Sequence, residues 1–558
     1  MRELFAQHAL AQIPKILTLL DRNPHSPTYG CFDRNFWHYK IIDFPSGMSQ
    51  EFVYPLALAY CLPIPNNPFY EKAVIREWVE AGILYAARSA HPDGSCDDYF
   101  PFERAGGAAA FSLLACLESY QMLGLDNYEI LKFFEKRADW LAEHNESGRL
   151  TNHQALIVLC LELAGQVLGQ PSKWARAKSR RLERVLEWQS EEGWFQEYEG
   201  CDPGYHTLTI WCLARFEQLR NHPDDRLRAA LDKAIELAGH FIHPDGSFGG
   251  EYASRNTYNF FPHGFEIAGQ WMSSALQIND RFLHGLANGL GPCYADDHIV
   301  GHHTWNYLLA WRDFVSERPP LPPRRVGHIW LKEAQILIDR RTTFPSVSED
   351  GDATDAPPLP DPKNPAEATI ELYVALNKGG VFKIFRDGQL VASDTQLSLQ
   401  VKSGNKLKNA VGHLVDRYQV QVQPHEVEIR GQLGWSKQQQ MTPLKLMVLR
   451  IVMLTVGRFF PNLIRKLLQK MLITGKSEAP FYFTRRFSWE KSHWLVTDEV
   501  TAKSWKDVKS AGIGCDQTSI YVVMSRTFQR NQLRSWIDLT AAIEQLPSDR
   551  ALQLTRKF

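Results

Sequence analysis

The residues best suited to chemistry lie in the stretch 191–206, EEGWFQEYEGCDPGYH, which runs directly into a helical pattern. A glycine turn opens into an acidic and aromatic loop, and this loop brings Tyr205 and His206 to the start of a helix. A phenol and an imidazole can each act as acid or base once their pKa values are tuned, and loops on a rigid scaffold often carry such groups. The alternative is structural: the tyrosine caps the core and the histidine packs beneath it.

Polar and aromatic loops of the same kind follow the glycine turns at Gly94, Gly148 and Gly246. If all of these turns lie on one face of the protein, the side chains that follow them converge there. We therefore expect one shared cleft at this face. The residues expected to converge in it are Asn152, His153, Tyr205, His206, Arg255, Asn256 and His263.

The chain from residue 55 to residue 315 must position these loops, and it repeats a single pattern. Amphipathic runs of helical period alternate with glycine turns. The turns are centred on Gly94, Gly148, Gly193, Gly246 and Gly289. A repeat of roughly 50 residues holds two helices and their loops, which is typical of stacked helical hairpins. We predict an incomplete (α/α) toroid over residues 1–318, with an open helical solenoid as the alternative.

Composition changes near residue 317, where the proline-rich break SERPPLPPRR ends the helical pattern. Residues 343–369 are acidic, rich in proline and poor in apolar residues, which indicates a flexible surface loop. Around this loop the apolar residues alternate with period 2, as in IELYVALN and QVQVQPHEVEIRGQL. Many strands joined by turns predict an antiparallel β-sandwich over residues 319–558.

One segment of this second domain has a helical pattern. Residues 441–474 are very apolar and carry only Lys and Arg as charged residues; between Glu428 and Glu478 there are nine basic residues and no acidic ones. Arg450 and Arg458 interrupt the apolar run, so a membrane-spanning helix is not expected. A basic amphipathic helix fits the surface of an anionic membrane or the groove of a protein partner. The alternative is an insertion that docks on its own protein.

Bulk composition excludes several classes of protein. The 62 basic residues are balanced by 63 acidic ones, so nothing favours binding to nucleic acid. The nine cysteines include no CxxC pair, which is typical of reduced thiols in a reducing compartment. Residues 1–23 are typical of a short amphipathic helix and not of a secretion signal. We expect a cytoplasmic protein, peripheral at the inner membrane face if residues 441–474 bind lipid, and we expect no cofactor.

Three motifs together resemble the heparinase II/III-like family of polysaccharide lyases and the alginate lyases that share its architecture. These motifs are TNHQAL at 151–156, EYEGCDPGYH at 197–206 and SRNTYNFFPHGFE at 254–266. The resemblance covers both domains and their order. It implies an (α/α) toroid followed by a β-sandwich, and an enzyme that cleaves uronate-containing poly- or oligosaccharides by β-elimination during capsule or exopolysaccharide metabolism.

The resemblance also implies roles for single residues. Asn152, with His153 beside it, would neutralise the uronate carboxylate. Tyr205 would act as general base or acid with His206 as its support, and His263, with Arg255, would bind substrate or be a second proton carrier. Abstraction of a proton next to a carboxylate needs charge stabilisation and a positioned base, which agrees with these residue types. The substrate-binding candidates are Arg255, Asn256, Glu197, Tyr252, Trp194 and His303.

One feature of these lyases is missing, and this keeps other functions open. The lyases usually carry an HxHxD-like stretch on an early sandwich strand, whereas residues 377–399 contain no histidine. A uronate C5 epimerase needs nearly the same tyrosine and histidine chemistry, and a non-catalytic polysaccharide-binding or assembly protein could retain the fold with an eroded site. A glycoside hydrolase on the same scaffold would use two carboxylates. The carboxylates available for it are Asp97, Asp98, Glu197, Glu199 and Glu251.

The stretch YADDHIVGHHTWNY at 294–307 raises the question of a metal site. On a helix, His298 and His302 would share a face, as a pair of metal ligands does. No glutamate occupies the position of a metalloprotease base. Helix capping and packing explain these residues better, so we predict that they bind no metal.

Overall fold

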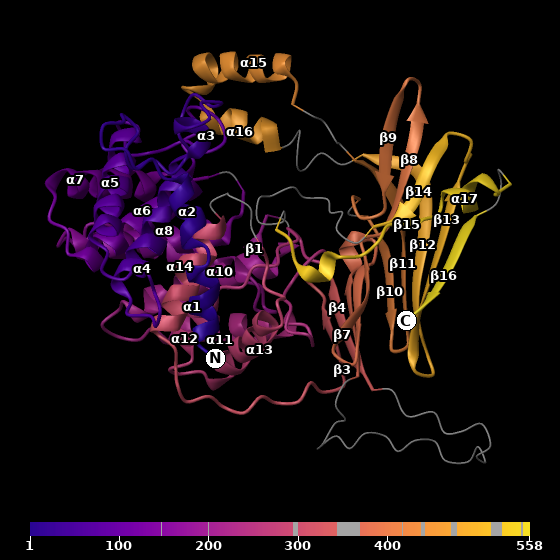
Figure 1. Ribbon diagram of the computed structural model, residues 1–558. Helices are drawn as coiled ribbons and strands as arrows, with labels where there is room; N and C mark the ends of the chain where they lie inside the picture. Colours follow the sequence, from indigo (N-terminus) through magenta and orange to yellow (C-terminus); the bar gives the residue numbers. More distant parts are fainter. Residues whose placement is uncertain are drawn as a thin grey trace.

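The computed structural model describes residues 1–146, 148–198, 200–293, 299–342, 369–415, 417–436, 441–469, 477–514, 527–547 and 551–558. Figure 1 shows a helical part with two β-sheets beside it, and a pair of helices, α15 (Pro443–Val452) and α16 (Pro461–Gln469), above the helical part. Helices dominate up to Arg312 and strands dominate from Gly327 onward. This arrangement of (α/α) toroid and antiparallel β-sandwich confirms the predicted fold class.

Six helices of the described chain form the inner ring of the toroid, because each contacts the next and the last contacts the first. Small and apolar residues cover these helices on all sides, as a helix buried all round requires. In α6, GGAAAFSLLACLESYQML, 16 of the 18 residues are buried. The inner helices are α4 (Val53–Cys61), α6 (Gly106–Leu123), α8 (Thr151–Val167), α10 (Pro203–Gln218), α12 (Pro262–Ala268) and α14 (Ile299–Arg312).

Amphipathic helices cover the outside of this ring. In α9, ARAKSRRLERVLE, only Arg181 and Val185 are buried, and the other side chains are exposed or half-buried. The outer helices are α1 (Glu3–Leu10), α2 (Ile13–Leu19), α5 (Ala73–Ser89), α7 (Tyr128–Glu143), α9 (Ala175–Glu187), α11 (Asp225–His240) and α13 (Ser273–Ala287). Two short helices, α3 (Arg34–Trp37) and the 3₁₀ helix η1 (Gly47–Phe52), connect α2 to α4.

The glycine turns have the backbone geometry that the sequence predicts. All five glycines have positive φ, for example 98° at Gly193 and 85° at Gly246. A Cβ atom on Gly193 would lie 2.6 Å from the carbonyl oxygen of Lys233 in α11. Glycine is therefore required at this turn both for its dihedral angles and for the close approach of another helix.

A five-stranded antiparallel sheet packs against the toroid, with its strands in the order β3-β4-β5-β6-β7. Both of its faces are buried: Tyr373 and Ala375 join the core of the toroid, whereas Leu372 and Val374 join the core between the two sheets. Burial on both faces explains why this segment is a continuous apolar run. The strands are β3 (Gly327–Leu331), β4 (Ile336–Arg341), β5 (Ile370–Ala375), β6 (Val381–Arg386) and β7 (Gln389–Asp394), and the 3₁₀ helix η2 (Leu376–Lys378) follows β5.

A larger antiparallel sheet forms the outer layer of the sandwich, and nine strands of the described chain belong to it. In β12 buried and exposed residues alternate, because one face packs on the inner sheet and the other faces solvent. Its strands are β8 (Leu397–Ser403), β9 (Lys406–Val411), β10 (Gln419–Gln423), β11 (Glu426–Ser436), β12 (Glu478–Glu490), β13 (His493–Ala502), β14 (Val508–Ile513), β15 (Ile537–Asp538) and β16 (Leu552–Lys557). Two short helices occur between its last strands: η6 (Arg530–Gln532) precedes β15, and α17 (Thr540–Glu544) follows β15.

The basic apolar segment is helical, as predicted. It consists of α15, the π-helical turn η3 (Met453–Gly457) and α16, which begins at Pro461. No helix among the described residues is long and apolar enough to span a membrane. The acidic stretch predicted at 343–369 lies, apart from Thr369, outside the described residues, and so do residues 470–474 of the basic segment.

Buried histidines make the stability of this fold depend on pH. Burial lowers the pKa of His206 and of His413 to about 4, compared with about 6.5 in an unfolded chain. The unfolded state therefore binds more protons between these two values, and stability is lost as pH falls through this window. Other buried groups also titrate here, so a difference between two chains is the better measurement.

We predict that His206→Gln destabilises the protein less at acid pH than at neutral pH. The loss in unfolding free energy caused by the substitution should shrink by about 1.4 kcal/mol between about pH 7.5 and about pH 5.5, because only the wild type has to protonate this histidine on unfolding. Denaturant unfolding of both chains at the two pH values measures this difference. A substitution cost that is independent of pH would contradict the prediction.

Candidate active site

Two inner helices begin at the candidate site. Asn152 and His153 are the second and third residues of α8, and Tyr205 is the third residue of α10. A short hairpin, β1 (Gln196–Glu197) with β2 (Gly200–Cys201), crosses beside both helix starts. The toroid therefore brings together the first and second lyase-like motifs, although Asn152 and Glu197 are 45 residues apart in the chain.

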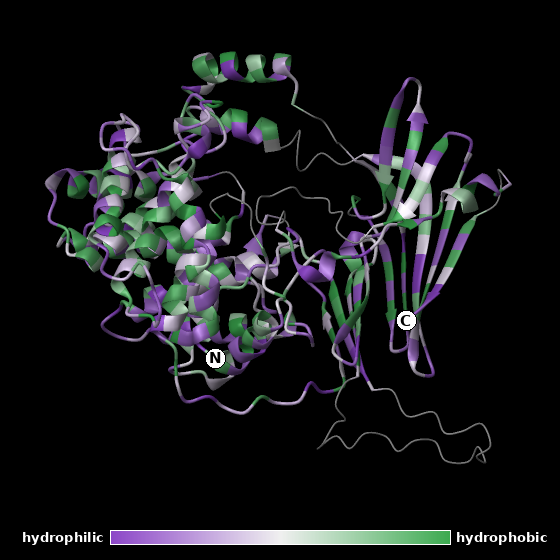
Figure 2. Ribbon diagram, in the orientation of Figure 1, coloured by the Kyte–Doolittle hydropathy of each residue, from purple (hydrophilic) through white to green (hydrophobic). Residues whose placement is uncertain are grey.

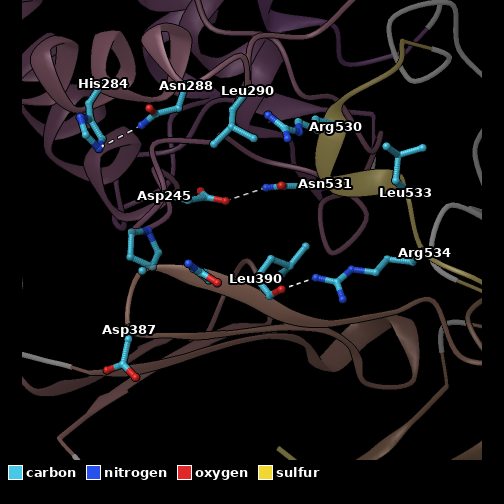
Figure 3. Close-up of a pocket in the computed structure, with 13 residues that line it drawn as sticks. Asp245, His284, Asn288, Leu290, Asp387, Leu390, Arg530, Asn531, Leu533 and Arg534 are labelled. Atoms are coloured by element: carbon cyan, nitrogen blue, oxygen red, sulfur yellow. Dashed lines mark hydrogen bonds between the residues drawn. The ribbon is translucent and has the colours of Figure 1, made fainter.

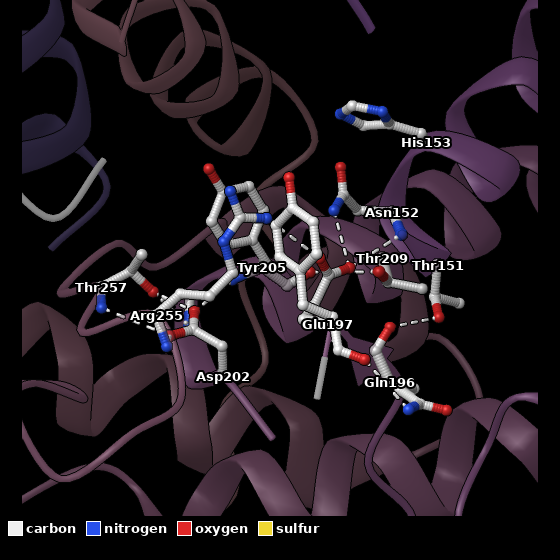
Figure 4. Close-up of polar contacts among 12 residues, drawn as sticks. Thr151, Asn152, His153, Gln196, Glu197, Asp202, Tyr205, Thr209, Arg255 and Thr257 are labelled. Carbon is white, nitrogen blue, oxygen red and sulfur yellow. Dashed lines mark hydrogen bonds and ion pairs between the residues drawn. The ribbon is translucent and has the colours of Figure 1, made fainter. Parts of the chain in front are cut away.

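A buried carboxylate connects these elements (Figure 4). Glu197, with no exposed surface, accepts hydrogen bonds from the backbone N–H of Asn152 at 3.0 Å and from its Nδ2 at 2.6 Å. Its other oxygen lies 3.2 Å from the guanidinium of Arg255, on the loop before α12. Burial raises the pKa of Glu197, while Arg255 and Asn152 lower it and leave a smaller net rise. One side chain thus holds a helix, a hairpin and a loop.

A second buried carboxylate holds the Arg255 loop against α10. Asp202 caps α10 by accepting a hydrogen bond from the backbone N–H of Tyr205 at 3.1 Å. Its other oxygen accepts from the backbone N–H of Arg255 at 3.0 Å, and the hydroxyl of Thr257 donates to the oxygen that caps the helix. The helix cap and the loop that carries Arg255 are therefore a single structure.

Arg255 lies over two tyrosine rings. Its guanidinium carbon is 3.9 Å from the ring centre of Tyr205 and 4.6 Å from that of Tyr198, which are favourable cation–π distances. Burial raises the pKa of the Tyr205 phenol; Arg255 acts in the opposite direction but does not outweigh burial. At neutral pH Tyr205 is therefore protonated and is suited to donate a proton.

His153 lies on the side of this network toward which the hydroxyl of Tyr205 points, and Glu146 holds its ring. Its Nδ1 is 2.5 Å from a carboxylate oxygen of Glu146, and its ring lies on Gly107 of α6, where a Cβ atom would be 2.6 Å from Cε1. Burial alone would raise the pKa of Glu146, but His153 and then Arg465 outweigh it and hold this pKa well below its usual range. About a fifth of the His153 side chain is exposed, so its other nitrogen remains the candidate for proton transfer.

Asn152 has polar atoms left over for a ligand. A carboxylate can only accept hydrogen bonds, so Glu197 fixes the amide with its nitrogen inward. The oxygen Oδ1 is buried and has no hydrogen-bond partner among the described residues. In Figure 4 this oxygen and the hydroxyl of Tyr205 point toward the side on which His153 lies. An unpaired buried acceptor is costly, and a sugar hydroxyl could satisfy this one.

The structure does not bring two of the predicted catalytic histidines to this cluster. His206 is fully buried, and its Nε2 is 2.8 Å from the carbonyl oxygen of Ala234 in α11. His263 is also fully buried, between Trp211 Nε1 at 2.9 Å and Asp313 at 2.8 Å. Burial lowers the pKa of each histidine to about 4. Both are neutral packing groups in this arrangement, which is the structural alternative that the sequence left open for His206.

Four of the predicted substrate-binding residues also have structural partners. Asn256 accepts a hydrogen bond at 2.6 Å from Lys378 of η2, which connects β5 and β6 of the inner sheet. The hydroxyl of Tyr252 lies 3.1 Å from Nε2 of buried His243. Trp194 donates to Glu192 at 3.1 Å, and His303 is buried with its ring 4.9 Å from that of Phe261. Two of the predicted binding residues, Glu197 and Arg255, contact the Asn152–Tyr205 cluster.

The carboxylates available for a hydrolase are used in the structure as well. Asp97 accepts hydrogen bonds from the backbone N–H groups of Phe102 and Arg104, and Asp98 accepts one from the hydroxyl of Ser46. Glu251 is buried 2.9 Å from Lys383. Glu199 lies outside the described residues.

Only one histidine of the pair near residue 300 lies within the described residues, and it has a carboxylate partner. His302 is 2.5 Å from the carboxylate of Glu51, deep in the inner ring, whereas His298 lies outside the described residues. No group of three or more potential metal ligands is found in the part of the chain that the structure describes.

Three contributors to the site are absent from the residues selected on sequence: Tyr198, Glu146 and Arg465. Tyr198 lies within the EYEGCDPGYH motif, and Glu146 lies in the turn before TNHQAL. Both are therefore within or next to motifs that were already selected on sequence. Arg465 is on α16, where its guanidinium donates to the carbonyl of Glu103 at 3.1 Å and lies 4.0 Å from Glu146. No local pattern could predict a contact across more than 300 residues.

A pocket of about 710 Å³ lies elsewhere, between the toroid, the start of β7 and residues 530–534 (Figure 3). No residue of the Glu197 cluster lines it. Two of its polar side chains are already paired: Asn531 donates to Asp245 at 2.6 Å, and Arg534 donates to the carbonyl of Leu390. The Glu197 cluster has buried charges, an unpaired acceptor and two proton-transfer groups, and it is the better candidate for an active site.

Comparison with known proteins finds similarity at the level of structure. No protein-family model matches the sequence, and no curated protein matches it. A chondroitin AC lyase from Streptomyces coelicolor A3 is similar at 10% identity and a TM-score of 0.41, over 99% of this chain and 94% of that one. The heparan sulfate lyase HepC from Pedobacter heparinus is similar at 11% identity and a TM-score of 0.41, over 84% and 63%.

Other solved structures found in the same comparison extend this set. An unsaturated glucuronyl hydrolase from Streptococcus agalactiae is similar at 11% identity and a TM-score of 0.36, over 56% of this chain and 91% of that one. Two heparinase III structures are similar at 10% and 12% identity, with TM-scores of 0.37 and 0.39, over 74% and 84% of this chain. The chain spans only 54% and 65% of the length of these two structures.

We predict that Glu197→Ala strongly destabilises the protein. The substitution leaves the guanidinium of Arg255 buried without its partner, and breaking a buried ion pair in this way costs about 3–5 kcal/mol. Glu183→Ala is the matched control, because Glu183 pairs with Arg226 at 2.7 Å on the surface, with about half of each side chain exposed. Denaturant unfolding should show a large loss for the first variant and almost none for the second. Equal losses would contradict the account of Glu197.

Proposed function

We propose that this protein is a polysaccharide lyase-like enzyme that cleaves uronate-containing poly- or oligosaccharides by β-elimination. The observation that carries the proposal is the buried Asn152–Glu197–Arg255 network, which sets the protonated phenol of Tyr205 on the same side as His153. Elimination needs a base for the C5 proton, an acid for the leaving oxygen and polar groups at the carboxylate next to C5. The cluster has all three.

In the proposed reaction His153 is the base. Glu146 accepts a hydrogen bond from Nδ1 and thereby orients the ring. Catalytic bases are commonly oriented by a neighbouring group in this way. The imidazole accepts the C5 proton on Nε2, the electron pair of the broken C–H bond forms the C4–C5 double bond, and the bond between C4 and the glycosidic oxygen breaks.

Tyr205 is the acid in this reaction. Since burial raises its pKa, the phenol carries its proton at neutral pH and delivers it to the departing glycosidic oxygen. The phenolate that remains lies under the guanidinium of Arg255, 3.9 Å from the ring centre, which stabilises its charge until solvent restores the proton. The second N–H of Asn152 and its free oxygen bind the substrate carboxylate and a hydroxyl group.

A hydrolase is less well supported by the same geometry. It requires two carboxyl groups on opposite sides of the scissile bond. Glu197 is bonded to Asn152 and Arg255, and the other described candidates, Asp97, Asp98 and Glu251, are bonded to backbone groups or side chains of their own surroundings. The proposal therefore rests on proton transfer by a phenol and an imidazole.

We predict that Tyr205→Phe abolishes the formation of unsaturated uronate. Loss of the general acid should lower kcat by about 10²–10⁴-fold, while the ring and its contact with Arg255 remain. Tyr252→Phe is the matched control: it also removes a buried hydroxyl, in this case one bonded to His243, away from the cluster. Ultraviolet absorbance of the C4–C5 double bond, measured on a panel of uronate polysaccharides and oligosaccharides, reports the reaction directly.

The outcomes of this experiment separate a lyase from a hydrolase and from a binding protein. An unsaturated product that requires Tyr205 but not the Tyr252 hydroxyl supports the lyase. Sugar release without an unsaturated product, unaffected by Tyr205→Phe, would mean a hydrolase. Binding of the panel without any reaction would mean a non-catalytic polysaccharide-binding protein, and either result would overturn the proposal.

A further inference from the structure

We propose that the helical pair α15–α16, residues 441–469, docks the protein on the surface of an anionic phospholipid bilayer. This inference concerns a surface distinct from the catalytic cluster and does not depend on the proposed reaction. It rests on the exposure of the apolar side chains of the segment, on its charge, and on the way in which the rest of the protein holds it.

The exposed apolar side chains of the protein are concentrated in this segment. Of the 27 large hydrophobic side chains that are exposed among the described residues, 12 lie within these 29 positions. Phe459 is 73% exposed, Leu444 69% and Phe460 60%. Figure 2 shows both helices with hydrophobic residues along them, at the edge of the toroid. Exposed apolar surface on this scale marks an interaction site.

The toroid contacts the segment largely through basic side chains, and only Met453 among the large apolar side chains of its described residues is fully buried. Arg450 pairs with Asp43 at 3.1 Å, and the guanidinium of Arg458 lies 5.3 Å from the ring centre of Phe102. No residue of α15 is buried. In the usual arrangement an amphipathic helix turns its apolar face to the core. Here 12 large apolar side chains of the segment face outward instead, while basic side chains hold it in place.

Charge selects the occupant of this surface. Residues 429–477 contain nine basic residues and no acidic ones. Lys445 and Lys466 are exposed beside the apolar side chains, where they can reach headgroup phosphates. Apolar side chains that enter the acyl boundary, flanked by lysine and arginine, are the chemistry of an interfacial helix on anionic lipid.

The shape of the segment also fits a bilayer surface. The α-helices α15 and α16 have 10 and 9 residues, too short to cross the hydrocarbon core, which needs about 20 apolar residues. Exposed apolar residues follow one another at Leu446, Met447 and Val448, on more than one side of α15. A single groove on a protein partner takes one stripe of a helix, whereas the plane of a bilayer accepts a broad apolar surface.

The neighbouring loop extends the same surface. Tyr39 and Ile41 are 54% and 71% exposed, and they precede Asp43, which holds α15. Aromatic and apolar side chains of this kind anchor proteins at the headgroup level. On its other side α16 supplies Arg465 to Glu146, the partner of His153. The docked protein would therefore present its candidate active site close to the membrane surface.

Vesicle flotation tests the proposal with the full-length protein. We expect binding to vesicles of phosphatidylcholine with phosphatidylglycerol, weaker binding to phosphatidylcholine alone, and a decrease with salt because headgroup attraction is screened. The triple variant F459S/F460S/L463S should reduce partitioning by about tenfold or more, since it removes three side chains from the acyl boundary. K466E should weaken binding to the anionic vesicles only.

Matched controls distinguish docking through α15–α16 from nonspecific adsorption of exposed apolar side chains. L321S/V391S/L407S removes three exposed apolar side chains elsewhere on the surface and should leave flotation unchanged. An unchanged unfolding midpoint shows that each variant is folded. The proposal is overturned if the wild-type protein does not float with anionic vesicles at low salt, if the α15–α16 variant floats as well as the wild type, or if the apolar surface instead mediates self-association that excludes vesicles.

Discussion

The candidate site depends on one buried carboxylate. Glu197 has no exposed surface, and it holds the start of α8 through Asn152 and the loop before α12 through Arg255. A charge removed from water costs several kcal/mol unless good geometry compensates for it. Here three donors, two from Asn152 and one from Arg255, surround the carboxylate. Since these donors belong to segments far apart in the chain, the site exists only when the toroid has closed around it.

The β-sandwich braces this site from outside. Lys378 donates to Asn256, the residue after Arg255, at 2.6 Å, and Lys383 pairs with Glu251 at 2.9 Å. Both lysines come from residues 377–399, the stretch that lacks the histidines found in the lyases this sequence resembles. The inner sheet therefore supports the loop that carries Arg255, whereas the groups that move protons in the proposed reaction come from the toroid.

Repeating patterns predicted the fold well, because each reflects a constraint along the whole chain. Glycine turns at Gly193 and Gly246 have the expected positive φ, and the change from helical period to period 2 separates toroid from sandwich. Proximity in sequence was a poorer guide to the site. Tyr205 and His206 are adjacent, but successive residues of a helix point about 100° apart, so one faces Arg255 and the other faces α11. Arg465 reaches Glu146 only through tertiary packing.

The central claim is that this cluster removes the C5 proton of a uronate. The most direct measurement is the fate of that hydrogen in oligosaccharides deuterated at C5, followed by mass spectrometry with the wild type and with His153→Ala. The account predicts loss of the C5 deuterium into solvent, dependent on His153, whether the double bond or the epimer forms. Complete retention of deuterium at C5 in cleaved product would contradict it and would indicate hydrolysis.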